Sequence, residues 1–132
     1  MISIGTFTVS DVEPVDYAPT IVTALPTGHL RMVKTYTGEV AGRSITQFSY
    51  AFDQETGTGT YVAMESFKGT VAGRRGAFNF VHTASTSGAD RSNEYGAIVP
   101  LSGTGELAGI SGSAALAVDS DGTHRIEFDH QG

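Results

Sequence analysis

The sequence contains no cysteine and no tryptophan, and only 4 of its 132 residues are proline. Without cysteine, the chain has no disulfide, no thiolate nucleophile and no cysteine-ligated zinc site. It also lacks a run of the ~18 apolar residues that a membrane-spanning helix requires. The first six residues, MISIGT, have neither the charged part nor the continuous apolar part of a signal peptide. We therefore expect a cytoplasmic protein.

Positive charge is scarce, because 8 lysines and arginines stand against 14 aspartates and glutamates and the net charge is −6. Only Arg74 and Arg75 are adjacent in the sequence, so no basic stripe is present to neutralise phosphates. We therefore expect neither nucleic acid nor an anionic membrane as a partner.

Glycine (17) and threonine (16) together make up a quarter of the chain, which is typical of strands joined by tight turns. No segment combines helical periodicity with helix caps. The predicted strands cover residues 3–10, 28–37, 41–52, 59–70, 74–83, 95–107, 110–119 and 122–129. Residues 11–27 are expected to form a long irregular connection and residues 84–94 an exposed loop.

Eight antiparallel strands avoid exposed edges by closing on themselves. We predict one all-β domain over residues 1–132, a closed antiparallel eight-stranded β-barrel, lipocalin-like in shape, with little or no helix. A two-sheet sandwich is the alternative. A barrel of this size has room for one small ligand.

A repeated pattern, G-x-[VL]-A-G, occurs at residues 38–42, 69–73 and 105–109. We interpret each Ala-Gly pair as a two-residue hairpin turn. In the second repeat, this turn places Glu65 opposite Phe80 and Ala63 opposite His82. One face then carries an aromatic surface with one carboxylate and one imidazole: Tyr61, Ala63, Glu65, Phe67, Phe78, Phe80 and His82.

The same reasoning on the other hairpins predicts further inward residues. The first repeat groups Val33, Thr35, Phe48, Tyr50 and Phe52, with Arg31 at the far end. The third groups Val99, Leu101, Leu107, Ile110, Leu116 and Val118. A loop at residues 120–122 pairs Val118 with His124, so the last strand points His124, Ile126 and Phe128 inward.

Four stretches carry a family resemblance: YVAME at residues 61–65, GTVAGRRGAF at 69–78 with His82, SGTGELAGISG at 102–112, and GTH at 122–124. They resemble a bacterial domain-of-unknown-function family of small proteins with the allene-oxide-cyclase-like barrel. Relatives of that fold include allene oxide cyclases, dirigent proteins and cyclases of natural-product pathways. The resemblance therefore implies the barrel, and a cyclase or isomerase by analogy.

Glu65 and His82 are the predicted catalytic pair, since burial among phenylalanines would raise the pKa of the Glu65 carboxyl and a nearby imidazole could share its proton. The alternative is a buried polar pair that fixes the register of the strands and does no chemistry. The expected substrate-binding residues are Tyr61, Phe67, Phe78, Phe80, Tyr50, His124 and Arg31.

The function that these residues favour is a cofactor-independent isomerase or cyclase that acts on a small, largely apolar metabolite. The four histidines have no metal-ligand spacing, so we expect no metal and no cofactor. A non-catalytic binding or carrier barrel is the first alternative, and a structural domain with a filled core is the second. The outward apolar residues Val62, Met64 and Val81 suggest self-association, as a homodimer or else a trimer.

Overall fold

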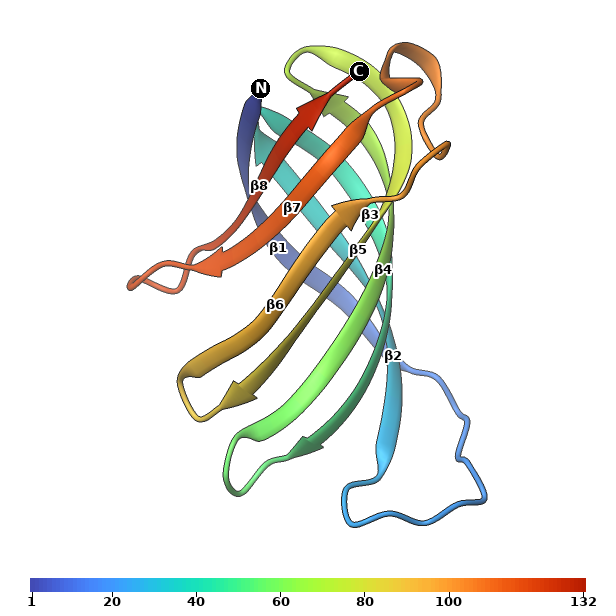
Figure 1. Cartoon of the computed structure of the whole chain (residues 1–132), viewed down its shortest axis with the longest axis vertical. Helices are drawn as coiled ribbons and strands as arrows, with labels where there is room; N and C mark the ends of the chain where they lie inside the picture. The colour runs from blue at the N-terminus through green and yellow to red at the C-terminus, as the bar shows by residue number, and fades with distance from the viewer.

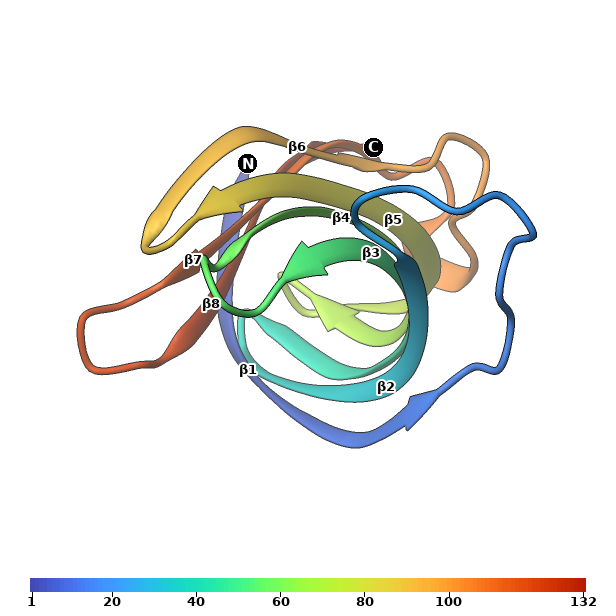
Figure 2. The same ribbon diagram turned by 90° about the horizontal axis from the view of Figure 1, so that it is seen from below.

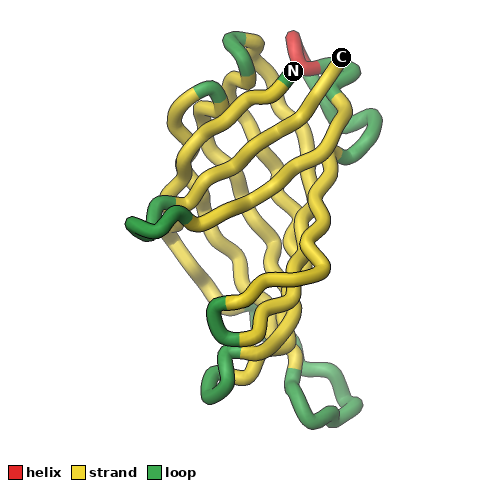
Figure 3. The backbone as a smooth tube through the Cα atoms, turned by 60° about the vertical axis from the view of Figure 1, so that its left-hand side comes forward, coloured by secondary structure: helices red, strands yellow, loops and turns green.

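The computed structural model describes all 132 residues. Its regular structure consists of strands, apart from one short 3₁₀ turn. The elements are β1 (Ile2–Pro14), β2 (Thr27–Gly38), β3 (Val40–Asp53), β4 (Thr58–Val71), β5 (Arg74–Ser87), β6 (Asp90–Ile98), the 3₁₀ turn η1 (Gly105–Leu107), β7 (Ser111–Val118) and β8 (His124–Gln131). The prediction of an all-β chain of eight antiparallel strands is confirmed (Figure 3). No helix in it could span a bilayer.

The strands form one sheet in sequence order, and β1 pairs with β8, so that hydrogen bonding runs around a ring (Figures 1 and 2). We call this barrel-like sheet the ring. Its weakest joint is between β6 and β7, where Ala97 opposite Ser113 is the one paired position. We call this joint the seam.

The β4–β5 hairpin has the predicted register. Ala72 and Gly73 form its turn with φ of 52° and 79°, and Glu65 lies opposite Phe80 and Ala63 opposite His82. Positive φ at both turn residues matches the right-handed twist of the flanking strands. The β7–β8 hairpin also has its predicted register, with Val118 opposite His124.

The first repeat was predicted wrongly. The β2–β3 turn lies at Gly38 and Glu39, and residues 41 and 42 are already part of β3. This moves the pairing by an odd number of positions, which turns the other face of β2 inward. Met32, Lys34 and Tyr36 are consequently the buried residues of β2.

The other corrections concern lengths and loops. β1 extends to Pro14, so the irregular connection covers residues 15–26. Residues 84–94 lie mostly in β5 and β6 rather than in a loop. The predicted strand 95–107 ends at Ile98, and the third repeat forms η1 instead of a hairpin turn.

The core fills the end of the ring at which both chain termini lie. Phe67, Phe78 and Phe80 alternate inward from β4 and β5, and Ile126 and Phe128 meet them from β8. The Phe80 and Phe128 rings are 5.0 Å apart at their centroids, in edge-to-face contact. Leu107 of η1 covers this end. Of the third group predicted to face inward, Leu101 and Val118 are instead exposed.

Candidate functional site

The Glu65 carboxylate is fully buried inside the ring and accepts four hydrogen bonds. Its Oε1 accepts from the hydroxyls of Tyr36 (2.5 Å) and Ser44 (2.7 Å). Its Oε2 accepts from Lys34 Nζ (2.6 Å) and His82 Nε2 (2.6 Å). Because β2, β3, β4 and β5 are consecutive neighbours, alternate residues of each strand converge on one interior point.

These contacts reverse the pKa shift expected from burial. Desolvation of Glu65 raises the pKa of its carboxyl, but the His82 hydrogen bond and the positive charge of Lys34 together outweigh it. The pKa of Glu65 falls to about 2. The prediction of a raised pKa is therefore wrong, and at neutral pH Glu65 is an ionised acceptor and a weak base.

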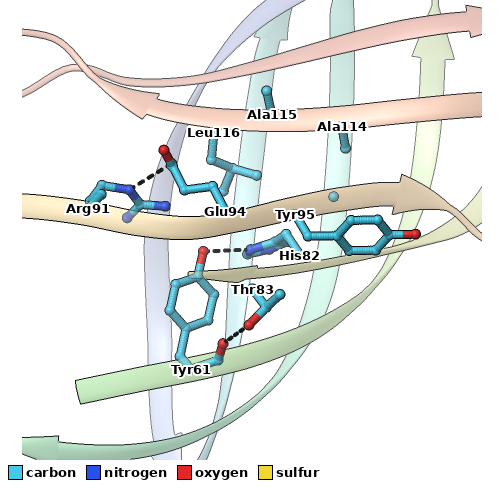
Figure 4. Close-up of a pocket in the computed structure, with 10 residues that line it drawn as sticks. Tyr61, His82, Thr83, Arg91, Glu94, Tyr95, Ala114, Ala115 and Leu116 are labelled. Atoms are coloured by element: carbon cyan, nitrogen blue, oxygen red, sulfur yellow. Dashed lines mark hydrogen bonds and ion pairs between the residues drawn. The ribbon is translucent and has the colours of Figure 1, made fainter. Parts of the chain in front are cut away.

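His82 joins this carboxylate to Tyr61. An ionised carboxylate only accepts, so Nε2 of His82 carries the proton that bonds Glu65. Its Nδ1 then accepts from the Tyr61 hydroxyl at 2.9 Å (Figure 4). Burial lowers the pKa of His82, and the Lys34 charge adds to this effect against the attraction of Glu65, so the imidazole is neutral at pH 7.

Of the three hydrogen-bonded residues Glu65, His82 and Tyr61, Tyr61 is the one at the end of the series, and it faces open space. Its ring stacks on Phe48 with centroids 4.8 Å apart. Burial raises the pKa of the Tyr61 hydroxyl, while the adjacent guanidinium of Arg91 works to lower it. Arg91 itself pairs with Glu94 on β6, at 2.9 Å (Figure 4).

Tyr61 and Arg91 line three hollows at the open end of the ring. One of about 190 Å³ lies at the seam and includes His82, Gly96 and Ala114. A second, of about 220 Å³, adds Lys34, Phe7 and His124. A third, of about 400 Å³, adds Phe48, Tyr50 and Phe52. No cluster of three histidine, aspartate or glutamate side chains suited to a metal ion occurs.

Comparison with known proteins places this arrangement in a family. A family model described as "Protein of unknown function (DUF3224)" matches residues 3–130. The chain belongs to the DUF3224 family. A similar crystal structure is that of a DUF3224 protein of unknown function from Shewanella oneidensis MR-1, whose sequence is 30% identical to this one. The two structures match with a TM-score of 0.86, and the match covers 99% of this chain and 96% of that chain. No curated protein matches the sequence.

The structure of this DUF3224 protein brings some predicted site residues together. Glu65 and His82 are in direct contact, and Tyr61 is bonded to His82. Tyr50 lines the largest of the three hollows. His124 lines the 220 Å³ hollow, where the centroid of its ring lies 5.2 Å from that of the Phe7 ring. Glu65, His82 and Tyr61 form a continuous hydrogen-bonded path from the interior, whereas Tyr50 and His124 line separate hollows. His124, which was predicted to point into the interior, is exposed to solvent.

Other predicted residues lie elsewhere. Phe67, Phe78 and Phe80 pack in the filled core and line none of these hollows. Arg31 points out of the ring and pairs with Glu13 at 2.5 Å, because the β2 register differs from the predicted one.

Sequence reasoning missed Lys34, Tyr36 and Ser44 around the carboxylate, and Arg91 beside Tyr61. For Lys34 and Tyr36 a signal was present, because they share one face of their strand with Met32. A turn placed at Gly38 would have directed that face inward. A lysine in that series is ordinarily taken to mark the outer face.

Proposed function

We propose that this DUF3224 protein is a cofactor-independent isomerase or cyclase that acts on a small, largely apolar metabolite at the open end of the ring. One observation carries the proposal: an unbroken chain of hydrogen bonds runs from the buried Glu65 carboxylate through His82 to the Tyr61 hydroxyl. Tyr61 ends this chain in the wall of all three hollows. The walls also carry aromatic and aliphatic side chains, which suit an apolar substrate.

The chain supports proton transfer in a defined direction. As the Tyr61 oxygen takes a proton from a substrate carbon, its own hydroxyl proton passes to Nδ1 of His82. The resulting imidazolium is stabilised by the ionised Glu65. Reversal of both transfers returns a proton to a different carbon and leaves an isomer of the substrate. Tyr61 is the catalytic residue in this scheme, and His82 and Glu65 position and polarise it.

Two competing functions rest on specific observations. All four contacts of the Glu65 carboxylate are intramolecular, which suits a structural network beneath a non-catalytic binding or carrier site. The phenylalanine-filled end suits a purely structural domain. The hollows around Tyr61 favour ligand binding over the second of these.

The wider setting is proposed with it. We take the ring to be a closed barrel of the allene-oxide-cyclase type, supported by the pairing of β1 with β8. We also propose a cytoplasmic protein that forms a homodimer, or else a trimer, through outward apolar residues. Val62 and Met64 are 49% and 40% exposed on that outer face.

The test is proton exchange in D₂O. A panel of small ketones and β,γ-unsaturated carbonyl compounds would be incubated with the protein, and deuterium incorporation followed by NMR. We expect incorporation into at least one compound, and a loss of about 10²-fold or more in Tyr61→Phe, which retains the ring but cannot carry the proton. Tyr17→Phe, at an exposed tyrosine that lines none of the three hollows, is the matched control and should retain the rate.

Binding is read in the same samples from amide shifts of residues around the hollows. Compounds that bind without exchange would identify a carrier rather than a catalyst. No binding at all across the panel would favour the structural domain.

A further inference from the structure

The outer face of β3, β4 and β5 carries a separate hollow, of about 590 Å³, on the side of the sheet opposite to the candidate site. Three cationic side chains line it: Arg43, Lys68 and Arg75. They come from three strands and are not adjacent in the sequence, so no basic cluster is visible before the strands are paired. We call this region the basic hollow.

Strand register brings the three cations together. Arg43 lies directly opposite Lys68 across the β3–β4 pair, and Arg75 lies opposite Thr70, two positions along β4 from Lys68. Opposite side chains of an antiparallel pair are about 5 Å apart at Cβ, and diagonal ones about 7–8 Å. All three cations are exposed, because their neighbours Ser44 and Phe67 point into the ring.

No ion pair within the protein involves the cations of the basic hollow. No acidic residue lines the basic hollow. The nearby Glu106 carboxylate instead accepts from the backbone N–H of Arg75 at 3.1 Å. Like charges placed directly opposite each other destabilise a sheet. This is an unusual feature in a chain with a net charge of −6.

The residues that line the basic hollow indicate which kind of anion it would bind. Ser66 and Thr70 add hydroxyl donors to the two guanidinium groups and the ammonium. Guanidinium groups bind phosphate oxygens in pairs, and a phosphoryl group carries about two negative charges. We propose that the basic hollow binds the phosphoryl group of a small soluble compound. This site is independent of the function proposed for Tyr61.

The experiment is an NMR titration of the whole chain with pyrophosphate and inorganic phosphate, with acetate as the monovalent comparison. We expect saturable shifts of amides at residues 42–44 and 66–70 with pyrophosphate, weaker binding of phosphate, and none of acetate. The double variant Arg43→Gln/Lys68→Gln should weaken pyrophosphate binding about tenfold or more.

The matched control is Arg74→Gln/Arg125→Gln, which lowers the net charge equally at sites outside the basic hollow. Arg74 donates to the carbonyl of Gly132, and Arg125 pairs with Asp119. The control should bind pyrophosphate within about twofold of the unmodified protein.

A second readout is thermal stability. Pyrophosphate should raise the melting temperature of the unmodified protein and of the control but not that of Arg43→Gln/Lys68→Gln. Without ligand, that variant should be at least as stable as the parent, since it removes the repulsion between two opposed cations.

The proposal is overturned by either of two results: an equal loss in both double variants, or no saturable pyrophosphate binding. In the second case, sedimentation of the protein with phosphatidic acid vesicles would identify a lipid surface as the ligand instead. The deuterium-exchange experiment with Tyr61 has no bearing on these results, so the two proposals fail separately.

Discussion

Replacement of Glu65 by glutamine tests the interior network most directly. The new amide oxygen can still accept from Tyr36 and Ser44, but the amide NH₂ group faces Lys34 and His82. His82 can change tautomer and accept from this group. Lys34 cannot, because an ammonium has no acceptor, and it is left 4% exposed without a counter-charge.

Two independent routes give the size of the effect. Removal of one partner of a buried ion pair costs about 3–5 kcal/mol. The pKa of Glu65 falls from 4.5 to about 2, which corresponds to about 3 kcal/mol of stability at neutral pH. We therefore expect Glu65→Gln to lower the free energy of unfolding by ~3 kcal/mol. A domain of this size has only about 5–15 kcal/mol in total.

The assay is urea unfolding at several pH values. Because the pKa of Glu65 is lowered in the folded state, its contribution is complete above pH 4.5 and is lost as the pH falls toward 2. The difference between parent and variant should shrink from about 3 kcal/mol at pH 7 to about 1 kcal/mol at pH 3. Lys34→Met/Glu65→Gln should cost less than the sum of its single changes.

A loss below about 1 kcal/mol, or a loss that does not change with pH, would refute the reasoning. It would mean that Lys34 reaches solvent or another acceptor when the carboxylate is removed. Because the expected loss is large, activity of Glu65→Gln must be measured on folded protein, so Tyr61→Phe is the better test of catalysis.

Two further predictions concern the filled end of the ring. Gly76→Ala should lower the free energy of unfolding by ~1–3 kcal/mol, measured with denaturant, because a Cβ at this position would lie 2.0 Å from the Thr104 carbonyl oxygen. Unchanged stability would mean that the η1 loop shifts freely. Burial lowers the pKa of His130, aided by the N-terminal ammonium and Arg74 against Asp129, so stability should fall as the pH drops below 6.5. His130→Gln should reduce this decrease between pH 7 and pH 5, measured as the urea midpoint, and an identical slope in both proteins would contradict the assignment.

Local signals predicted the parts of the fold that local chemistry determines. The Ala72-Gly73 turn adopts positive φ at both residues, which fixes the register of β4 against β5 and so the contact of Glu65 with His82. In the first repeat the corresponding Ala-Gly pair, Ala41 and Gly42, lies inside β3, because the chain has already turned at Gly38. A pentapeptide does not distinguish these two cases.

The rest of the site depended on contacts between distant strands. Lys34 is buried because Glu65, 31 residues away in the chain, accepts a hydrogen bond from its ammonium group, and neither residue alone indicates this. The rule that apolar residues stay together favoured Val33 and Thr35 as the inner face of β2. Arg91 was assigned to a loop, so its place beside Tyr61 could not be predicted.

The pairing of β1 with β8 has a consequence for how the chain is made. The ammonium group of Met1 donates to the His130 carbonyl at 2.9 Å, so the first strand completes its hydrogen bonding with the last one. At about 5–20 residues per second, ribosomal synthesis separates these strands by on the order of ten seconds. During that interval the hairpins from β2 to β5 can form, but one edge of β1 has no partner. A newly made chain therefore exposes an unprotected strand edge on β1 until β8 has been synthesised and paired, and an exposed strand edge promotes aggregation.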